Sequence, residues 1–172
     1  MDLLLPAHSG LMRQLHECLQ RWETMQASTH VYLENAAIDL DAARSVSEAT
    51  LGVLDPALVP AIASSSRDSA ELMLRGLRKA IDALERVLDA MREAQATGRA
   101  TLSASQLHEA TLLGWLDDCV RMFAAELMHK RMILASVEDE RTARRSLAGW
   151  TEEPFLNRAL LARIEAAVLP TS

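Results

Sequence analysis

The stretch LGWLDDCVRMFAAELMHKRMILASV, residues 113–137, decides how this chain folds. Its apolar residues recur at steps of three and four, the spacing that places side chains on one face of an α-helix. The apolar positions are Leu116, Val120, Phe123, Leu127, Leu134 and Val137. The position due between Leu127 and Leu134 is Lys130, so the pattern predicts a long helix with one charge in its apolar seam.

Two earlier stretches have the same spacing and predict two more long helices, over about residues 9–50 and 67–97. The seam of the first comprises Leu15, Cys18, Trp22, Met25, Thr29, Tyr32, Ala36, Leu40 and Ala43. The seam of the second is the most regular in the chain and comprises Leu74, Leu77, Ile81, Leu84, Leu88 and Met91. Alternating steps of three and four are typical of coiled coils and long bundle helices.

Helix-breaking residues separate these segments. Asp55-Pro56 and the serine run 64–66 predict an irregular, flexible link between the first two helices. Asp68 is a predicted cap for the second helix, and Gly98 is its predicted stop.

The third long helix is expected over about residues 103–145, because Ser103 and Gln106 match a capping box. Leu102 and Leu107 are spaced as a hydrophobic staple that would fix the same start. A short last helix is expected over about residues 154–169, beginning near Pro154.

The composition agrees with an all-α protein. Of 172 residues, 49% are hydrophobic and only 3% are aromatic, so the core must be aliphatic. The length suits one domain. We therefore expect residues 1–172 to form a single helical domain: an elongated antiparallel bundle of three long helices plus a short C-terminal helix, with coiled-coil-like packing.

The bulk properties argue against several classes of protein. A net charge of -6 disfavours a nucleic-acid-binding surface, so no direct nucleic-acid contact is expected. No apolar run approaches the roughly 20 residues that span a bilayer, and the start of the chain is no signal peptide. These features predict no membrane contact and an intracellular location. Cys18 and Cys119 form no Cys-x-x-Cys pair, which disfavours zinc-ribbon and thioredoxin-like sites.

The sequence contains few patterns that carry chemistry. A phosphate-binding Gly-rich loop and a Gly-x-Ser-x-Gly elbow are both absent. One Glu-x-x-His pattern occurs, Glu126 with His129, whereas di-iron bundles use two such patterns and two further glutamates. We therefore predict no enzyme, no catalytic residue, no metal and no cofactor. A metal-dependent bundle enzyme is the alternative that rests on this one pattern.

The charge in the seam permits two interpretations. Glu126 precedes Lys130 by four residues, the favourable order for a helical ion pair. An isolated buried charge is costly, so the lysine stem either lies along the seam with its ammonium group in water, or the pair meets a polar group of another helix. The second interpretation points to an interface, because a polar seam residue can select a partner.

The segment Trp150–Phe155 also permits two interpretations. Its aromatic residues and Pro154 could close one end of the bundle core, or they could anchor a partner protein. The core role is favoured. Together with Glu126, Lys130 and Arg131, residues Trp150, Pro154 and Phe155 are the candidate partner-binding residues.

Three motifs carry a resemblance to a known family. RWETM at residues 21–25, FAAELMHKR at residues 123–131 and WTEEPF at residues 150–155 occur in that order. They resemble the Trp-Glu-Thr, aromatic-x-x-Glu-Leu-x-x-Lys-Arg and Trp-x-x-x-Pro-aromatic segments of the cyclin-dependent kinase 2-interacting protein family. The likeness covers the first helix and the C-terminal third, and the family's extended N-terminal leader is expected to be missing.

The resemblance implies a non-enzymatic helical adaptor of the nucleus or cytoplasm. Members of that family pair with a second small helical protein in an assembly built on AAA+ ATPases. The assembly is linked to large ribosomal subunit biogenesis and to the turnover of replication proteins, and members are also linked to cyclin-dependent kinase and checkpoint signalling. The alternative hypothesis, based on the seam from Leu74 to Met91, is a self-associating coiled-coil structural or scaffolding protein.

Overall fold

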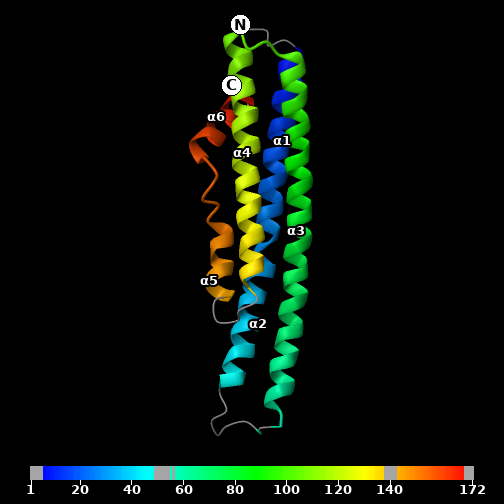
Figure 1. Ribbon diagram of the computed structural model, residues 1–172, viewed down its shortest axis with the longest axis vertical. Helices are drawn as coiled ribbons and strands as arrows, with labels where there is room; N and C mark the ends of the chain where they lie inside the picture. The colour runs from blue at the N-terminus through cyan, green and yellow to red at the C-terminus, as the bar shows by residue number, and fades with distance from the viewer. Residues whose placement is uncertain (1–5, 49–54, 56, 138–142, 169–172) are drawn as a thin grey trace. The chain divides into compact units, whose positions relative to one another are not determined.

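The protein is all-α, as its sequence predicts. The computed structural model describes residues 6–48, 55, 57–137 and 143–168, and every regular element within them is helical (Figure 1). The α-helices are α1 (Pro6–Ser28), α2 (His30–Glu48), α3 (Val59–Thr101), α4 (Leu107–Ser136), α5 (Ala143–Ala148) and α6 (Arg158–Val168), with one 3-10 helix, η1 (Gly149–Thr151), after α5.

The chain divides into two compact units, each assembled from separate segments. Unit 1 comprises Met1–Thr24, Ala83–Leu127 and Pro154–Ser172, and unit 2 comprises Met25–Asp82 and Met128–Glu153. Helices α1, α3 and α4 therefore each contribute residues to both units. The expectation of one domain stays a prediction.

Unit 1 has a closely packed aromatic and aliphatic core. The rings of Trp22 and Phe123 meet edge to face with their centroids 4.6 Å apart, an arrangement that adds to the stabilisation from burial. Unit 1 contains further fully buried side chains, namely Leu15, Leu84, Leu88, Met91, Leu116 and Ile164. Helices α3 and α4 approach closely at Gly98, where a Cβ atom would lie 2.9 Å from the Leu116 side chain.

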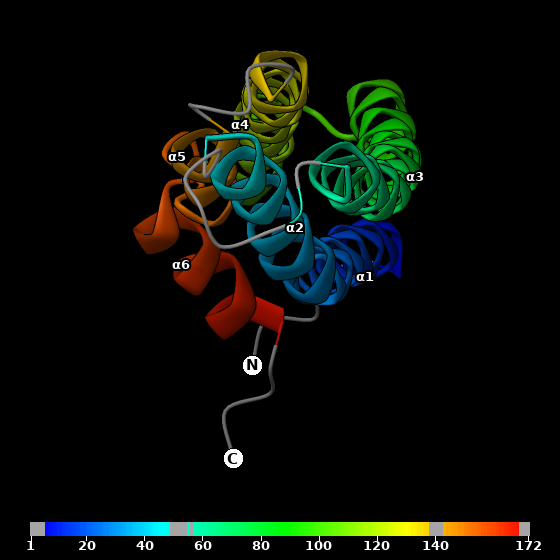
Figure 2. The same ribbon diagram turned by 90° about the horizontal axis from the view of Figure 1, so that it is seen from below.

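Unit 2 is held by α2, the first half of α3, the end of α4, and α5. The Tyr32 ring of α2 lies over Gly76 of α3, 2.7 Å from where a Cβ atom would be. Ser69 of α3 donates a hydrogen bond of 2.6 Å to Asp39 of α2. Helix α5 lies beside α2 in both ribbon views (Figures 1 and 2).

The first predicted helix, residues 9–50, is wrong in one respect, because a turn at Thr29 divides it into α1 and α2. The backbone N–H of Thr29 and its hydroxyl both donate to the carbonyl of Gln26, at 3.1 and 2.6 Å. Bonding three residues back tightens the last turn of α1 and ends it. Apolar spacing cannot reveal this break, since Leu33 and Ala36 beyond it continue the buried seam.

The second predicted helix, residues 67–97, is too short at both ends. The serine run 64–66 is helical, and so is Asp68, which caps nothing. Helix α3 starts earlier because Asp55 accepts a hydrogen bond from the Ala57 N–H at 2.9 Å and forms a turn there. The buried face also extends back through the serines, since Ala63 and Ala70 are buried at the seven-residue spacing that leads to Leu77. Gly98 does not end the helix but permits the close approach of α4.

The start predicted for the third long helix is also wrong. Ser103 precedes α4, and its hydroxyl contacts that of Ser105 at 2.6 Å instead of capping the helix. The carboxylate of Glu109 accepts the Ser103 N–H and also contacts the buried Nε2 of His8, at 3.1 Å. Leu107 is 79% exposed, so the hydrophobic staple does not form.

The ends of the last two helices differ from prediction as well. Helix α4 ends at Ser136, whose hydroxyl donates to the Ile133 carbonyl at 2.7 Å, and does not continue to residue 145. Residues 138–142 lie outside the described residues. Helix α6 begins at Arg158 instead of residue 154, because the Asn157 side chain accepts the Leu160 N–H at 3.1 Å and caps it.

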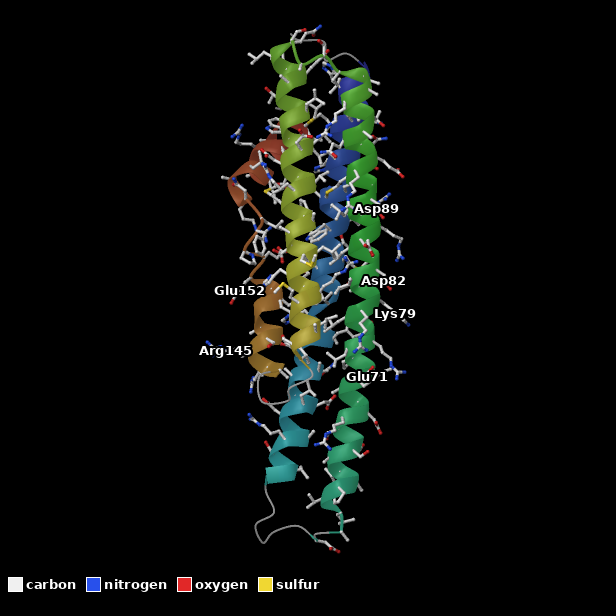
Figure 3. The ribbon with its side chains drawn as sticks, viewed as in Figure 1. Glu71, Lys79, Asp82, Asp89, Arg145 and Glu152 are labelled. Atoms are coloured by element: carbon white, nitrogen blue, oxygen red, sulfur yellow. The ribbon has the colours of Figure 1, made fainter. Side chains whose placement is uncertain are left out.

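Charged side chains of α3 occupy its solvent face, as the heptad predicts. In unit 2, Lys79 and Asp82 are exposed, and Glu71 accepts hydrogen bonds from Arg78 and Arg75 at 2.7 and 3.3 Å (Figure 3). The bond from Arg78, followed by that from Arg75, lowers the pKa of Glu71. In unit 1, Asp89 is exposed in the same way (Figure 3).

Candidate partner-binding surface

Lys130 is the centre of a buried polar cluster in unit 2. Its side chain is 0% exposed, and its Nζ donates a hydrogen bond of 2.7 Å to the backbone carbonyl of Trp150. The same Nζ lies 3.9 Å from Oε1 of the buried Glu153 and 5.2 Å from the centre of the Trp150 ring. A buried ammonium group needs such partners, because an isolated charge there would be very costly.

Trp150 makes two more hydrogen bonds within this cluster besides the one from Lys130. Its carbonyl accepts a second hydrogen bond, from Nε2 of Gln26 at 3.1 Å. Its indole Nε1 donates to the hydroxyl of Thr29, also at 3.1 Å. The Trp150 side chain is fully buried, so a large apolar ring has its polar group satisfied, as buried tryptophan requires. The turn that divides α1 from α2 therefore also provides the acceptor for Trp150.

This geometry decides between the interpretations of Lys130. The ammonium group is not in water, so the interpretation of an amphipathic stem at a bundle edge is wrong. Instead the lysine meets polar groups of η1 and the segment that follows it. Glu153 has a positive φ of 44° and is the one described non-glycine residue with such a backbone, a conformation that costs energy for a residue with a Cβ atom.

In unit 1, Glu126 binds the backbone after Pro154. Its side chain is fully buried, and its Oε2 accepts the Phe155 N–H at 3.3 Å. The Asn157 N–H contacts the sulfur of Met122 at 3.3 Å. These contacts hold the entry to α6 against α4, while Pro154 and Phe155 expose their side chains, Phe155 by 50%.

The six candidate residues thus have different surroundings. Lys130, Trp150 and Glu126 are buried, and the contacts described above bind parts of this chain to one another. Trp150 is fully buried, as its favoured core role predicts, whereas Phe155 is half exposed, and closure of one end of the bundle core by this segment stays a prediction. Arg131, Pro154 and Phe155 have surface for a partner, and partner binding by any of the six stays a prediction.

Exposed apolar side chains extend the surface of unit 2 around Arg131. Met128 and Met132 are exposed on α4 four residues apart, and the exposed Arg131 lies three residues after Met128. Methionine side chains adapt to irregular surfaces and are common where proteins bind helices. The sequence pattern assigned these two residues no role.

A groove in unit 2 lies between α2 and the segment formed by α5 and η1. Its volume is about 420 Å³, and its walls come from Leu33, Ala37 and Ile38 of α2 and from Leu147 and Ala148 of α5. Polar groups at its edges are His30, Glu34, Arg144 and Thr151. No sequence pattern indicated the groove, because its two walls are far apart in the chain.

The search for a possible metal site covers only the described residues. Among the described residues, no group of three or more His, Cys, Asp or Glu side chains could hold a metal ion. Cys18 and Cys119 are both buried free thiols of unit 1. Within the same described part of the chain, no helix combines the length and apolar character that crossing a bilayer requires.

The comparisons with known proteins give no relative. No protein-family model matches the chain, and neither the curated proteins nor the solved structures contain a significant match. The residues themselves therefore carry the functional argument.

Sequence reasoning missed the partners of Lys130. Thr29 was assigned to an apolar seam, and Gln26 and Glu153 were assigned no role, yet these three complete the buried cluster. A charge in a seam signals that buried partners must exist, but it does not say where in the chain they are. The pair of His8 and Glu109 was missed for the same reason, because 101 residues separate them.

Proposed function

We propose that this protein is a non-enzymatic adaptor subunit. It pairs with a second small helical protein and binds an AAA+ ATPase complex that acts in large ribosomal subunit biogenesis and in replication- and checkpoint-linked protein turnover. A cyclin-dependent kinase is a further partner in this proposal. Its place of action is the nucleus, the cytoplasm or both.

One observation carries the proposal: unit 2 presents many large apolar side chains to solvent. Among the described residues of unit 2, these are Val31, Tyr32, Ile38, Leu58, Ile62, Leu72, Met128 and Met132. Large apolar side chains that are exposed in the free chain are candidates to be covered by a protein partner. The three motifs that resemble the cyclin-dependent kinase 2-interacting protein family support the choice of partners.

The proposal includes a finer description of the fold. The chain would form an elongated antiparallel bundle with coiled-coil-like packing, in which α1 with α2, α3 and α4 are the three long members and α6 is the short one. Such a bundle offers long helical faces, the kind of surface that binds other helices.

Affinity purification tests the adaptor function. The full chain, tagged and shown by circular dichroism to be folded, is incubated with cell lysate, and bound proteins are identified by mass spectrometry. We expect an AAA+ ATPase and a small helical protein in near-equal amounts. Recovery of neither from a folded sample would overturn the proposal.

The alternative is a self-associating coiled-coil structural or scaffolding protein. The exposed pair Met128 and Met132 on α4 favours it, because a second copy could cover both. The seam from Leu74 to Met91 supports it less, since all its residues except Leu74 are buried within this chain. Light scattering of the purified protein distinguishes the two: a tight homo-oligomer supports the alternative, and a monomer supports the adaptor.

A further inference from the structure

The groove between α2 and the α5–η1 segment of unit 2 has the features of a helix-binding site. Its lining is mainly apolar, because Leu33 and Leu147 are buried and the α2 wall also contributes the half-buried Ala37. Ile38 stands at its edge with 62% of its surface exposed. From His30 to Ile38 the α2 wall runs about 12 Å at 1.5 Å per residue, which is between two and three helical turns.

The charges along the groove differ between its two walls. On the α2 wall Glu34 is exposed and contacts Nε2 of His30 at 3.2 Å. On the α5 wall Arg144 binds Asp41 at 2.9 Å, yet its side chain is 76% exposed. A guanidinium has five N–H donors, so this contact leaves others for a second carboxylate. The edges of the groove therefore present an exposed carboxylate, that of Glu34, and an exposed guanidinium, that of Arg144, which is shared with Asp41 of α2.

The shape argues for a helix and against a small molecule. The groove is partly open to solvent, whereas small-molecule sites enclose most of the ligand surface. A helix laid in such a groove buries one apolar stripe and keeps its charged flanks at the edges.

We propose that this groove binds one amphipathic helix of a partner protein, with a basic flank towards Glu34 and an acidic flank towards Arg144. The site deepens the proposed function, on which it rests only in assuming a helical protein partner. It also gives the buried cluster a role in binding. The hydrogen bond from Lys130 to Trp150 positions η1, and η1 contributes Thr151 to the groove.

Selection from a displayed library of three-turn helices tests the site without knowledge of the partner. The bait is the full chain, and the matched counter-bait is Ala37→Glu, which places a carboxylate between the apolar walls. Ala61→Glu is the control, because Ala61 is exposed in the first turn of α3, where a carboxylate is tolerated.

We expect the selected helices to share an apolar stripe with a basic flank on one side and an acidic flank on the other. In fluorescence anisotropy they should bind wild type and Ala61→Glu equally, and Ala37→Glu about tenfold more weakly or not at all. Exchanging the two flanks within a selected peptide should weaken binding about threefold to tenfold, the range expected for charges at an edge.

Several outcomes would overturn the site. These are a failure to select any helix, binding that Ala37→Glu leaves unchanged, or indifference to the order of the flanks. If light scattering shows that the wild-type chain is a homodimer and that Ala37→Glu is a monomer, the groove binds a second copy of this chain instead. Failure of the two proposals can be told apart. If selected helices bind the groove but no ATPase is recovered from lysate, the groove proposal holds and the adaptor proposal fails. If wild type and Ala37→Glu recover the ATPase equally, the adaptor proposal holds and the groove proposal fails.

Discussion

The two units of this protein treat their large apolar side chains differently. Among the described large apolar side chains of unit 1, only Leu107 and Phe155 are exposed, and the others are buried or half-buried. Unit 2 exposes many, and its largest fully buried side chains are Trp150, Leu77 and the lysine Lys130. Unit 2 therefore leaves more large apolar side chains uncovered than unit 1, the feature on which the proposed partner binding rests.

The two units also differ in the interactions that hold them together. In unit 1, we expect the packing of aromatic and aliphatic side chains to supply most of the stability, because burial of apolar surface is the largest favourable contribution to the free energy of folding. In unit 2 a charge and its hydrogen bonds hold the η1 segment, and such groups favour one arrangement over others more than they add stability. Substitutions in the two units should therefore have different consequences.

The largest loss of stability is expected from Trp22→Ala in unit 1. Removing a buried aromatic side chain that packs against Phe123 should lower the free energy of unfolding by about 3–5 kcal/mol. Urea denaturation followed by circular dichroism measures it. The matched control is Ile38→Ala in unit 2, which should cost less than about 0.5 kcal/mol because Ile38 is largely exposed. Equal losses would remove the distinction between the units.

Lys130→Met should have the next largest effect, and it is expected in unit 2. Methionine fills a similar volume but leaves the Trp150 carbonyl without its charged donor, at a cost of about 2 kcal/mol. Hydrogen exchange should show faster exchange of the amides between residues 149 and 153. The control Lys79→Met changes an exposed lysine of the same unit and should alter neither quantity. Unchanged exchange in Lys130→Met would mean that other contacts hold η1.

The sequence predicted the type of fold but not its long-range polar contacts. Steps of three and four identify helices and their buried faces because that periodicity is local. The break at Thr29 and the late start of α4 depend on single side-chain hydrogen bonds, which compete with helical ones only in a particular structure.

For the candidate residues, the sequence likewise indicated unusual positions but not their distant partners. Lys130 was recognised as unusual because a charge in a seam needs a partner, and its partners were found 20 or more residues away. The groove beside α5 could not be predicted at all, because it exists only once distant segments are packed.

Gly98 in unit 1 and Gly76 in unit 2 allow the tightness of packing in the two units to be compared at single positions. In unit 1, Gly98→Ala brings a methyl group within 2.9 Å of the fully buried Leu116 side chain, which has no solvent to turn into. Overpacking should outweigh the gain in helix propensity and destabilise by about 1 kcal/mol. In unit 2, Gly76→Ala meets the Tyr32 ring, which is partly exposed and can turn outward, so a change near zero is expected. Thermal denaturation measures both.

Gly114→Ala is the control for these glycines, since nothing lies within 4 Å of its added methyl group. It should stabilise α4 by about 0.5–1 kcal/mol. A Gly76→Ala variant as unstable as Gly98→Ala would show that unit 2 is packed as tightly as unit 1.

The smallest effect at neutral pH concerns the two cysteines, both of which lie in unit 1. Burial, with lesser contributions from Asp118 and Cys18, raises the pKa of Cys119 to about 12. A folded pKa above the unfolded value near 8.5 means that the thiol stabilises the fold fully below that value. This contribution is lost as the pH rises from about 9 towards 12. The free energy of unfolding should therefore fall over that range, and Cys119→Ala should fall less steeply.

The rate at which Cys18 and Cys119 are alkylated measures the opening of unit 1, because both thiols lie there. The thiolate is the reactive form, and burial disfavours it. Alkylation by iodoacetamide at pH 8 should be slow in the native protein and rapid in urea. Lys130→Met should leave the native rate nearly unchanged if unit 2 opens by itself. A rate that rises in proportion to the loss of global stability would instead show that both units unfold together, as helices α1, α3 and α4, which contribute to both, would allow.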